Sequence, residues 1–191
     1  MCYKVMKIIV AEHLGMCFGV RDAIGQAERL AAEAPLTILG QLVHNPAVRE
    51  QLRAQGVKEQ HSLPTDGSQR VMITAHGVSD ARRAQLQQRG LDVADGTCPL
   101  VKHAHTQLRQ LVASGYSPVV IGLPNHVEVR GLTEDFAEAV IVNDFADIAR
   151  LPRVPRFGII SQTTQPIGRV HTLVEAIRHA RRRMMRTTRS H

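Results

Sequence analysis

Two cysteines, Cys17 and Cys98, have side chains that could hold a metal or act as a nucleophile. Cys17 stands in "GMCFG" and Cys98 in "GTCP", and the sequence has three cysteines in all, far apart. An odd number at wide spacing disfavours a disulfide framework and favours a reducing compartment. A zinc ribbon would need close CxxC pairs. Cys98 could therefore be a ligand, a nucleophile or a buried core group, and thiolates from separate segments suit an iron–sulfur cluster assembled between domains.

Further chemistry-bearing side chains follow the apolar runs of the sequence. They are three histidines, one glutamate and two threonines: His44, His76, His126, Glu128, Thr163 and Thr164. Three histidines among glycine and threonine loops make a cradle for a phosphate-type anion. Glu128, two residues beyond His126, could then move protons. Taken singly, a strand-end cysteine or histidine is usually structural and "TT" is usually a helix cap, so only their convergence favours a site.

The elements that must position these residues alternate along the chain. Short β-branched runs predict strands at residues 7–11, 36–40, 70–75, 91–95, 118–122, 139–143 and 156–161. Helical patterns lie between them, at 20–34, 46–54, 79–89, 100–114 and 166–182. This alternation predicts an α/β fold with two tandem parallel-sheet domains, 1–98 and 99–177. Ligands of open parallel sheets bind at the carboxyl ends of the strands, where the candidate residues fall.

The net charge of +7 comes largely from one end of the chain. Six arginines and no acidic residue lie in residues 178–191, which we interpret as a solvated basic tail. Elsewhere lysines and arginines nearly balance the 17 acidic residues, and with two Tyr, four Phe and no Trp, nucleic acid is not expected as a partner. No apolar run could span a membrane and no signal peptide is apparent, so we expect a cytoplasmic protein.

Six short motifs carry a family resemblance. In chain order they are "GMCFGV", "LVHNPAV", "TAHGVSD", "DGTCPLV", "NHVEVRG" and "SQTTQ". In wording, order and spacing they resemble the LytB family of 4-hydroxy-3-methylbut-2-enyl diphosphate reductases, over about residues 7–174. The resemblance implies an oxygen-sensitive enzyme with a 4Fe-4S cluster, which performs the last step of the methylerythritol phosphate route to isoprenoids. That step reductively removes an allylic hydroxyl to give isopentenyl and dimethylallyl diphosphates.

The resemblance also implies roles for single residues and partners. Cys17 and Cys98 would be cluster ligands, with Pro99 starting the helix behind Cys98. His44, His76 and His126 would hold the diphosphate of the small-molecule substrate. Glu128, with Thr163 or Thr164 nearby, would deliver the proton that turns the hydroxyl into leaving water. A low-potential donor such as ferredoxin or flavodoxin would supply electrons.

The family has a three-domain trefoil architecture, and its third cluster cysteine follows the helix after the "QTT" motif. The sequence has no cysteine there, and we do not expect Cys2 to replace it. We therefore expect a truncated family member that lacks the third domain, with little activity of its own. Two alternatives stay open: a member that needs a second chain for the third domain and cysteine, and a non-catalytic anion-binding module.

Overall fold

The described part of the first half of the chain forms a four-stranded parallel sheet. The computed structural model describes residue 9, residues 15–64 and residues 70–187. The strands, in the order β2-β1-β3-β4, are β1 (Thr37–Leu39), β2 (Lys58–Gln60), β3 (Arg70–Ile73) and β4 (Asp92–Asp95). Three helices accompany this sheet: α1 (Phe18–Glu33), α2 (Pro46–Ala54) and α3 (Asp80–Gln88). Helix α3 is the crossover between the parallel neighbours β3 and β4.

The second half repeats this plan with three strands in its described part. The order is β6-β5-β7, with β5 (Ser117–Ile121), β6 (Val140–Val142) and β7 (Phe157–Ser161), all parallel. The helical elements are α4 (Pro99–Ala113), α5 (Val127–Thr133), the 3₁₀ helix η1 (Ala146–Arg150) and α6 (Ile167–Thr187). In both halves the first of the described strands lies inside the sheet, the second described strand pairs on one side of it and the third on the other.

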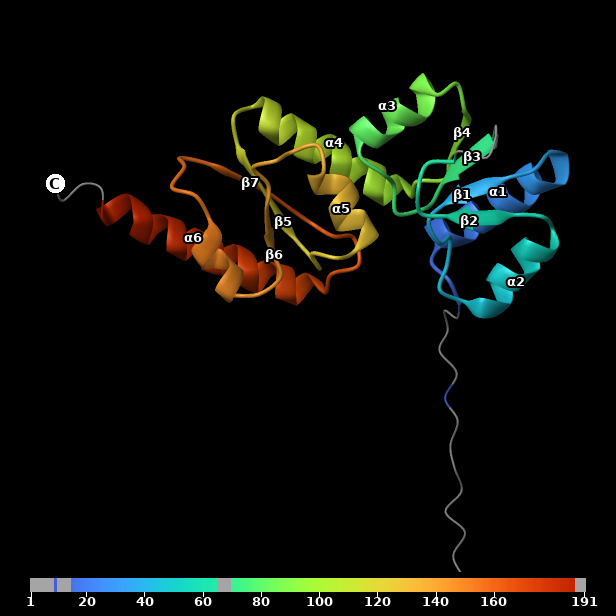
Figure 1. Ribbon diagram of the computed structural model, residues 1–191. Helices are drawn as coiled ribbons and strands as arrows, with labels where there is room; N and C mark the ends of the chain where they lie inside the picture. The colour runs from blue at the N-terminus through green and yellow to red at the C-terminus, as the bar shows by residue number, and fades with distance from the viewer. Residues whose placement is uncertain (1–8, 10–14, 65–69, 188–191) are drawn as a thin grey trace, which may run out of the picture.

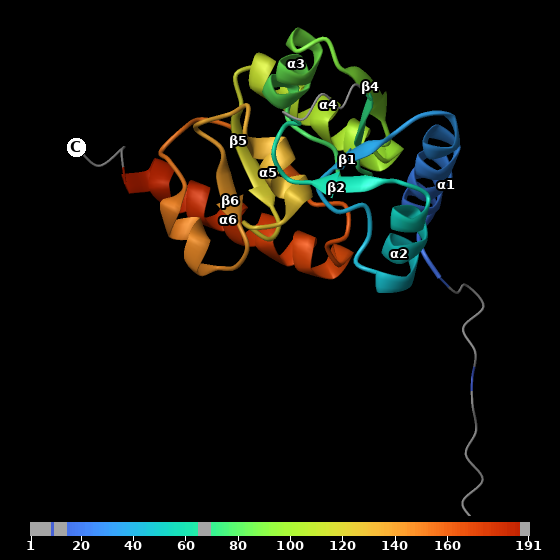
Figure 2. The ribbon, with the colours of Figure 1, turned by 45° about the vertical axis from the view of Figure 1, so that its right-hand side comes forward.

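Each sheet is covered by helices on both faces, because its strands are apolar on both sides. In the first half, α1 and α2 pack on Ile38 and Met72, whereas Leu86 of α3 packs on the opposite face. In the second half, α4 and α5 pack on Val120, whereas α6 packs on Val119 on the other face. The two lobes lie side by side in Figure 1, with α5 turned toward the first sheet in Figures 1 and 2.

Polar contacts join the two halves at the start of α3. The carboxylate of Asp135 accepts hydrogen bonds from the backbone N–H groups of Asp80 and Ala81, at 2.7 and 3.0 Å. The hydroxyl of Ser79 donates to Glu134 at 2.6 Å. Asp135 of the second half therefore satisfies backbone donors that the first turn of a helix leaves unpaired, and Glu134 binds the N-cap side chain.

The structure confirms the predicted α/β fold class and its parallel sheets. Six predicted strands are present, and α4 begins at Pro99 as expected. The predicted strand at 7–11 lies outside the described residues except for Ile9. Strand β2, helix α5 and η1 were not predicted, and α6 extends beyond the predicted end at 182, so most of the basic tail is helical. The domain boundary at residue 98 stays a prediction, and in the described parts no helix is long and apolar enough to cross a membrane.

Candidate functional site

The two cysteines lie at the starts of two helices that meet in space. Cys17 is the N-cap residue of α1 and Cys98 that of α4, and neither side chain caps its own helix. Gly19, in the first turn of α1, packs directly against the Cys98 thiol. The two thiols, exposed at Cys17 and partly exposed at Cys98, are donors of the soft type that iron–sulfur clusters use.

Gly19 gives a direct test of this packing. A Cβ atom at this position would lie 2.6 Å from Sγ and 2.9 Å from Cβ of Cys98. We expect Gly19→Ala to push Cys98 aside and to lower the free energy of unfolding by about 1–3 kcal/mol. Chemical denaturation measures this change. The matched control is Gly25→Ala on the same helix, where the nearest atom is the end of the flexible Arg29 side chain at 3.5 Å. Alanine there should be neutral or stabilising by up to about 1 kcal/mol, and equal destabilisation by both substitutions would contradict the packing argument.

Asp95 holds the loop that carries Cys98. Its carboxylate accepts hydrogen bonds from the backbone N–H of Thr97, at 3.0 Å, and from the Thr97 hydroxyl. Lys102 and Arg83 pair with the other oxygen at 3.0 and 3.3 Å. Burial alone would raise the pKa of Asp95, but these partners outweigh it and lower the pKa from 3.8 to about 2. The charged carboxylate therefore stabilises the folded loop.

The lowered pKa of Asp95 predicts a pH-dependent contribution to stability. Because the folded-state pKa lies below the unfolded one, the contribution is present above pH 3.8 and is lost as the pH falls toward 2. After allowing for partial exposure, we expect Asp95→Asn to lower the free energy of unfolding by about 1–2 kcal/mol at neutral pH. Denaturation curves should show this difference shrinking below pH 4.

The control for Asp95 is Asp92→Asn. Asp92 lies on the same strand, and its side chain is 61% exposed in its pair with Arg70. Such exposed pairs contribute about 0–1 kcal/mol. A difference between wild type and Asp95→Asn that stays constant down to pH 3 would contradict the assignment.

A buried carboxyl and a threonine form the second part of the site. Glu128, on α5, is only 1% exposed. Its Oε1 accepts a hydrogen bond from the backbone N–H of Thr163 at 2.7 Å, and its Oε2 accepts one from the Thr163 hydroxyl at 3.0 Å. The pair joins α5 to the turn after β7, so the buried carboxyl has a fixed position.

Thr164 is held by a residue that the sequence analysis did not single out. Gln162, 2% exposed, donates from its amide to the Thr164 hydroxyl at 3.0 Å and accepts from the Leu123 N–H at 3.1 Å. It therefore ties the turn after β7 to the loop after β5. The glutamines that flank the two threonines in "SQTTQ" were the available signal, since a buried amide needs several partners.

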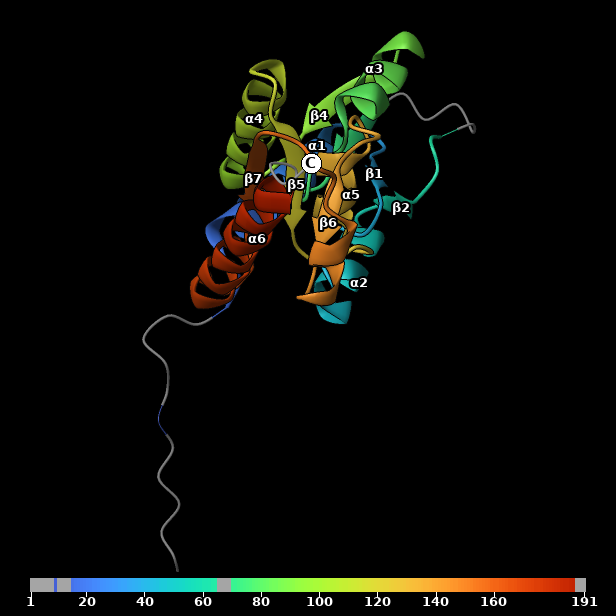
Figure 3. The ribbon, with the colours of Figure 1, turned by 90° about the vertical axis from the view of Figure 1, so that its left-hand side faces the viewer.

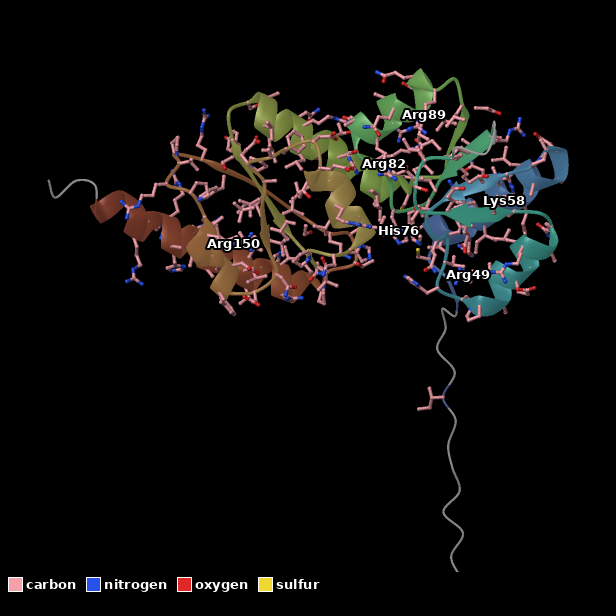
Figure 4. All side chains as sticks on the ribbon, in the orientation of Figure 1. Arg49, Lys58, His76, Arg82, Arg89 and Arg150 are labelled. Carbon is pink, nitrogen blue, oxygen red and sulfur yellow. The ribbon has the colours of Figure 1, made fainter. Side chains whose placement is uncertain are left out.

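The three histidines lie at the junction of the two halves. The rings of His76 and His126 meet edge to face with centroids 5.4 Å apart. Nδ1 of His126 accepts the Glu128 backbone N–H at 3.2 Å, so in the neutral ring Nε2 carries the proton and can donate to a ligand. His44 lines the same cavity as His76, whose position is labelled in Figure 4. Nδ1 of His76 is buried and, among the described residues, has no hydrogen-bond partner.

Contacts connect the two parts of the site. The Cys98 N–H donates to the carbonyl of Ala75 at 3.0 Å, which places the thiol loop beside the residue before His76. The ring of the next residue, His76, contacts the ring of His126. His126 is the N-cap residue of α5, the helix that carries Glu128, and Glu128 is hydrogen-bonded to Thr163. Six of the eight predicted residues are thus connected in one series: Cys17, Cys98, His76, His126, Glu128 and Thr163. Thr164 is connected to this series by its hydrogen bond with Gln162. His44 lines the same cavity as His76. Their roles stay predictions.

Taken together, the fold and the site define a doubly wound α/β protein with two thiols at helix starts, and with histidines and a buried carboxyl in the segments that follow its strands. A family model described as LytB protein matches residues 8–189. The chain belongs to the LytB family.

Relatives and solved structures agree with this family. The 4-hydroxy-3-methylbut-2-enyl diphosphate reductase of Geobacter sulfurreducens is 36% identical over 173 residues, which are 89% of this chain and 61% of that protein. The reductase of Geobacter metallireducens is 35% identical over 91% of this chain and 62% of its own length. The chain thus spans about three fifths of these relatives.

Among solved structures, a Plasmodium falciparum E-1-hydroxy-2-methyl-but-2-enyl-4-diphosphate reductase matches with a TM-score of 0.80 and 27% identity, covering 86% of this chain and 54% of that one. A second match is a structure of (E)-4-hydroxy-3-methyl-but-2-enyl diphosphate reductase, described as the terminal enzyme of the non-mevalonate pathway. It has a TM-score of 0.77 and 34% identity, over 89% and 63% of the two chains.

Proposed function

We propose that this chain forms part of a reductase that removes the allylic hydroxyl of (E)-4-hydroxy-3-methylbut-2-enyl diphosphate. The observation that carries the proposal is the connected series of thiols, histidines, carboxyl and threonine. The reaction takes up two electrons and two protons, breaks the carbon–oxygen bond and releases water. Its products are isopentenyl and dimethylallyl diphosphates, the end products of the methylerythritol phosphate route to isoprenoids.

Cys17 and Cys98 are the residues that would hold a 4Fe-4S cluster. Their donor chemistry fits such a cluster, and Gly19, two residues after Cys17, packs against the Cys98 thiol. Among the described residues no group of three or more His, Cys, Asp or Glu could bind a metal by itself. When bound, the cluster supplies the electrons one at a time and a Lewis-acidic iron for the hydroxyl. The low-potential electrons would come from a ferredoxin or a flavodoxin. We also propose a cytoplasmic location for the protein.

The remaining residues would bind the substrate and move the proton. His44, His76 and His126 would donate ring N–H groups to the diphosphate, which fits the open Nε2 of His126 and the unpartnered Nδ1 of His76. Glu128 would deliver the proton that lets the hydroxyl leave as water, with Thr163 holding its carboxyl in place. Thr164 would contact the substrate from the same turn.

We further propose that a third domain completes the site, supplied by a continuation of this polypeptide or by a second chain. In the described parts, β7 has no strand on its outer side, whereas the equivalent β3 pairs there with β4. Figure 3 shows β7 at this edge, between α4 and α6. Cavities of about 430 and 300 Å³ follow the edge, and both are lined by Ile159 and Val174. An added parallel strand would bury this apolar surface.

A non-catalytic anion-binding module is the second candidate function. The unpartnered Nδ1 of His76 favours it, because a phosphate-type ligand could satisfy this group without any cluster. Under this alternative the chain binds a diphosphate whether or not iron and sulfide are present.

Anaerobic reconstitution tests both candidates. The 191-residue chain is loaded with iron and sulfide and given a low-potential reductant and the hydroxylated diphosphate, with and without the unmatched part of the Geobacter sulfurreducens relative as a separate polypeptide. We expect isopentenyl and dimethylallyl diphosphates when that polypeptide is present, and little turnover otherwise. Product formation in neither mixture, with the complete relative active under the same conditions, would contradict the reductase proposal.

A further inference from the structure

The cavity between the two halves is lined by charged side chains as well as by histidines. Its volume is about 410 Å³. The first half contributes His44, His61, His76 and Arg82 to its lining, and the second half contributes Arg130 of α5 and Glu134, which follows this helix. Figure 4 shows His76 and Arg82 at this junction, with Arg150 well away from it on the second half.

The histidine between these groups supplies little permanent charge. Burial lowers the pKa of His76 below its usual value, and the neighbouring His126 and His44 lower it further. Near neutral pH its ring is therefore mainly uncharged and acts as a hydrogen-bond donor or acceptor. A diphosphate carries several negative charges, whereas an arginine stays protonated at any pH at which the protein is folded.

The two arginines come from different halves of the protein, Arg82 from α3 and Arg130 from α5. Arg82, half-buried on α3, donates from Nη2 to the carbonyl of His61 at 2.8 Å, which fixes its guanidinium at the cavity wall. Arg130 is exposed on α5, and within the described ranges it forms no ion pair. Glu134 also lines the cavity, but its carboxylate accepts the Ser79 hydroxyl at 2.6 Å. Glu134 is thus directed toward the start of α3.

We propose that Arg82 and Arg130 hold a phosphate group of the diphosphate between the two halves, beside His44 and His76. The inference rests on the proposed function for the identity of its ligand, a diphosphate monoester. Guanidinium groups suit this task, because their N–H groups pair with two phosphate oxygens at once. Arg130 makes the affinity depend on α5, so both halves contribute to the binding of one ligand.

Titration calorimetry with inorganic pyrophosphate tests the two arginines on the 191-residue chain. Removing one charged donor should weaken binding by roughly tenfold or more, so we expect this for Arg130→Gln and for Arg82→Gln. Arg82→Lys keeps the charge but loses the forked geometry of the guanidinium, so its affinity for pyrophosphate should lie between those of wild type and Arg82→Gln. The matched control is Arg150→Gln on η1, whose side chain is 64% exposed and pairs only with Asp147 among the described residues. Thermal denaturation establishes that each variant is folded.

The outcomes separate this inference from the proposed function. Wild-type affinity for pyrophosphate in Arg130→Gln and Arg82→Gln, an equal loss in Arg150→Gln, or no binding by wild type would each overturn the arginine site. The hydroxylated C5 diphosphate is titrated in parallel, into the reconstituted mixture that contains the third-domain polypeptide. If it fails to bind while pyrophosphate binds through the arginines, the arginine site stands and the proposed substrate is wrong. If it binds equally well to wild type and both arginine variants, the arginine site is wrong and the substrate assignment stands.

Discussion

Replacing Cys98 by serine is expected to abolish the binding of an iron–sulfur cluster to this chain. A neutral hydroxyl is a poor ligand for iron in such a cluster, so iron and sulfide content after anaerobic reconstitution should fall by more than about tenfold. Cys17→Ser should do the same, because Cys17 stands two residues before Gly19, which packs against the Cys98 thiol. Metal and sulfide analysis, with visible absorption, measures the loss directly and does not depend on turnover.

The position of Cys98 makes this substitution a clean test. Cys98 is the N-cap residue of α4, and serine is a favoured N-cap residue, so the helix should keep or gain stability. The backbone hydrogen bond from residue 98 to Ala75 does not involve the side chain and should remain. Cys2→Ser is the control, with cluster content expected to match wild type. Full cluster content in Cys17→Ser and Cys98→Ser would show that these thiols are not the ligands.

The strands that were predictable are those with apolar residues on both faces. Val119, Val120 and Ile121 in β5 are all buried, and an unbroken apolar run of this kind is the pattern of an internal parallel strand. Strand β2 has the polar sequence Lys58-Glu59-Gln60 and lies at the sheet edge. Glu59 helps to hold this strand, because it pairs with Arg49 and accepts a hydrogen bond from the Leu42 N–H. Contacts of this kind leave no pattern in the local amino-acid sequence from which a strand could be predicted.

Helix α5 was missed for a different physical reason. Its sequence, "VEVRGLT", alternates apolar and polar residues at first, which is typical of a strand, and contains a glycine that disfavours a helix. Tertiary contacts override this preference, since buried Glu128 is fixed by Thr163 and buried Leu132 packs in the core between α4 and the second sheet. A seven-residue helix of this kind depends on its surroundings.

The types of the site residues could be predicted, but most of their contacts could not. Glu128 and Thr163 are 35 positions apart, so their hydrogen bonds follow from the pairing of β5 with β7. The approach of Gly19 to Cys98 likewise depends on how α1 packs on the first sheet. Arg130 stands in the motif "NHVEVRG" but was not singled out there, and only the position of α5 beside the first half places it in the cavity.

Replacing Glu128 by glutamine is expected to lower turnover in the active reconstituted mixture by about 10² to 10⁴. An amide has no acidic proton to deliver to the leaving hydroxyl, whereas its shape matches that of the carboxyl. Its oxygen can still accept the Thr163 N–H, and its NH₂ group can donate to the Thr163 hydroxyl, so the buried pair should survive. We therefore expect cluster content, pyrophosphate affinity and the midpoint of thermal denaturation to stay close to wild type while product formation falls.

Glu138→Gln is the matched control, because it makes the same chemical change at an exposed position just before β6. Its turnover should equal that of wild type. If Glu128→Gln loses turnover together with cluster content or stability, the carboxyl has a structural role and does not move the proton. If Glu128→Gln turns over as fast as Glu138→Gln, the proton must come from another group or from water, since the only change at the site would be the loss of that acidic proton.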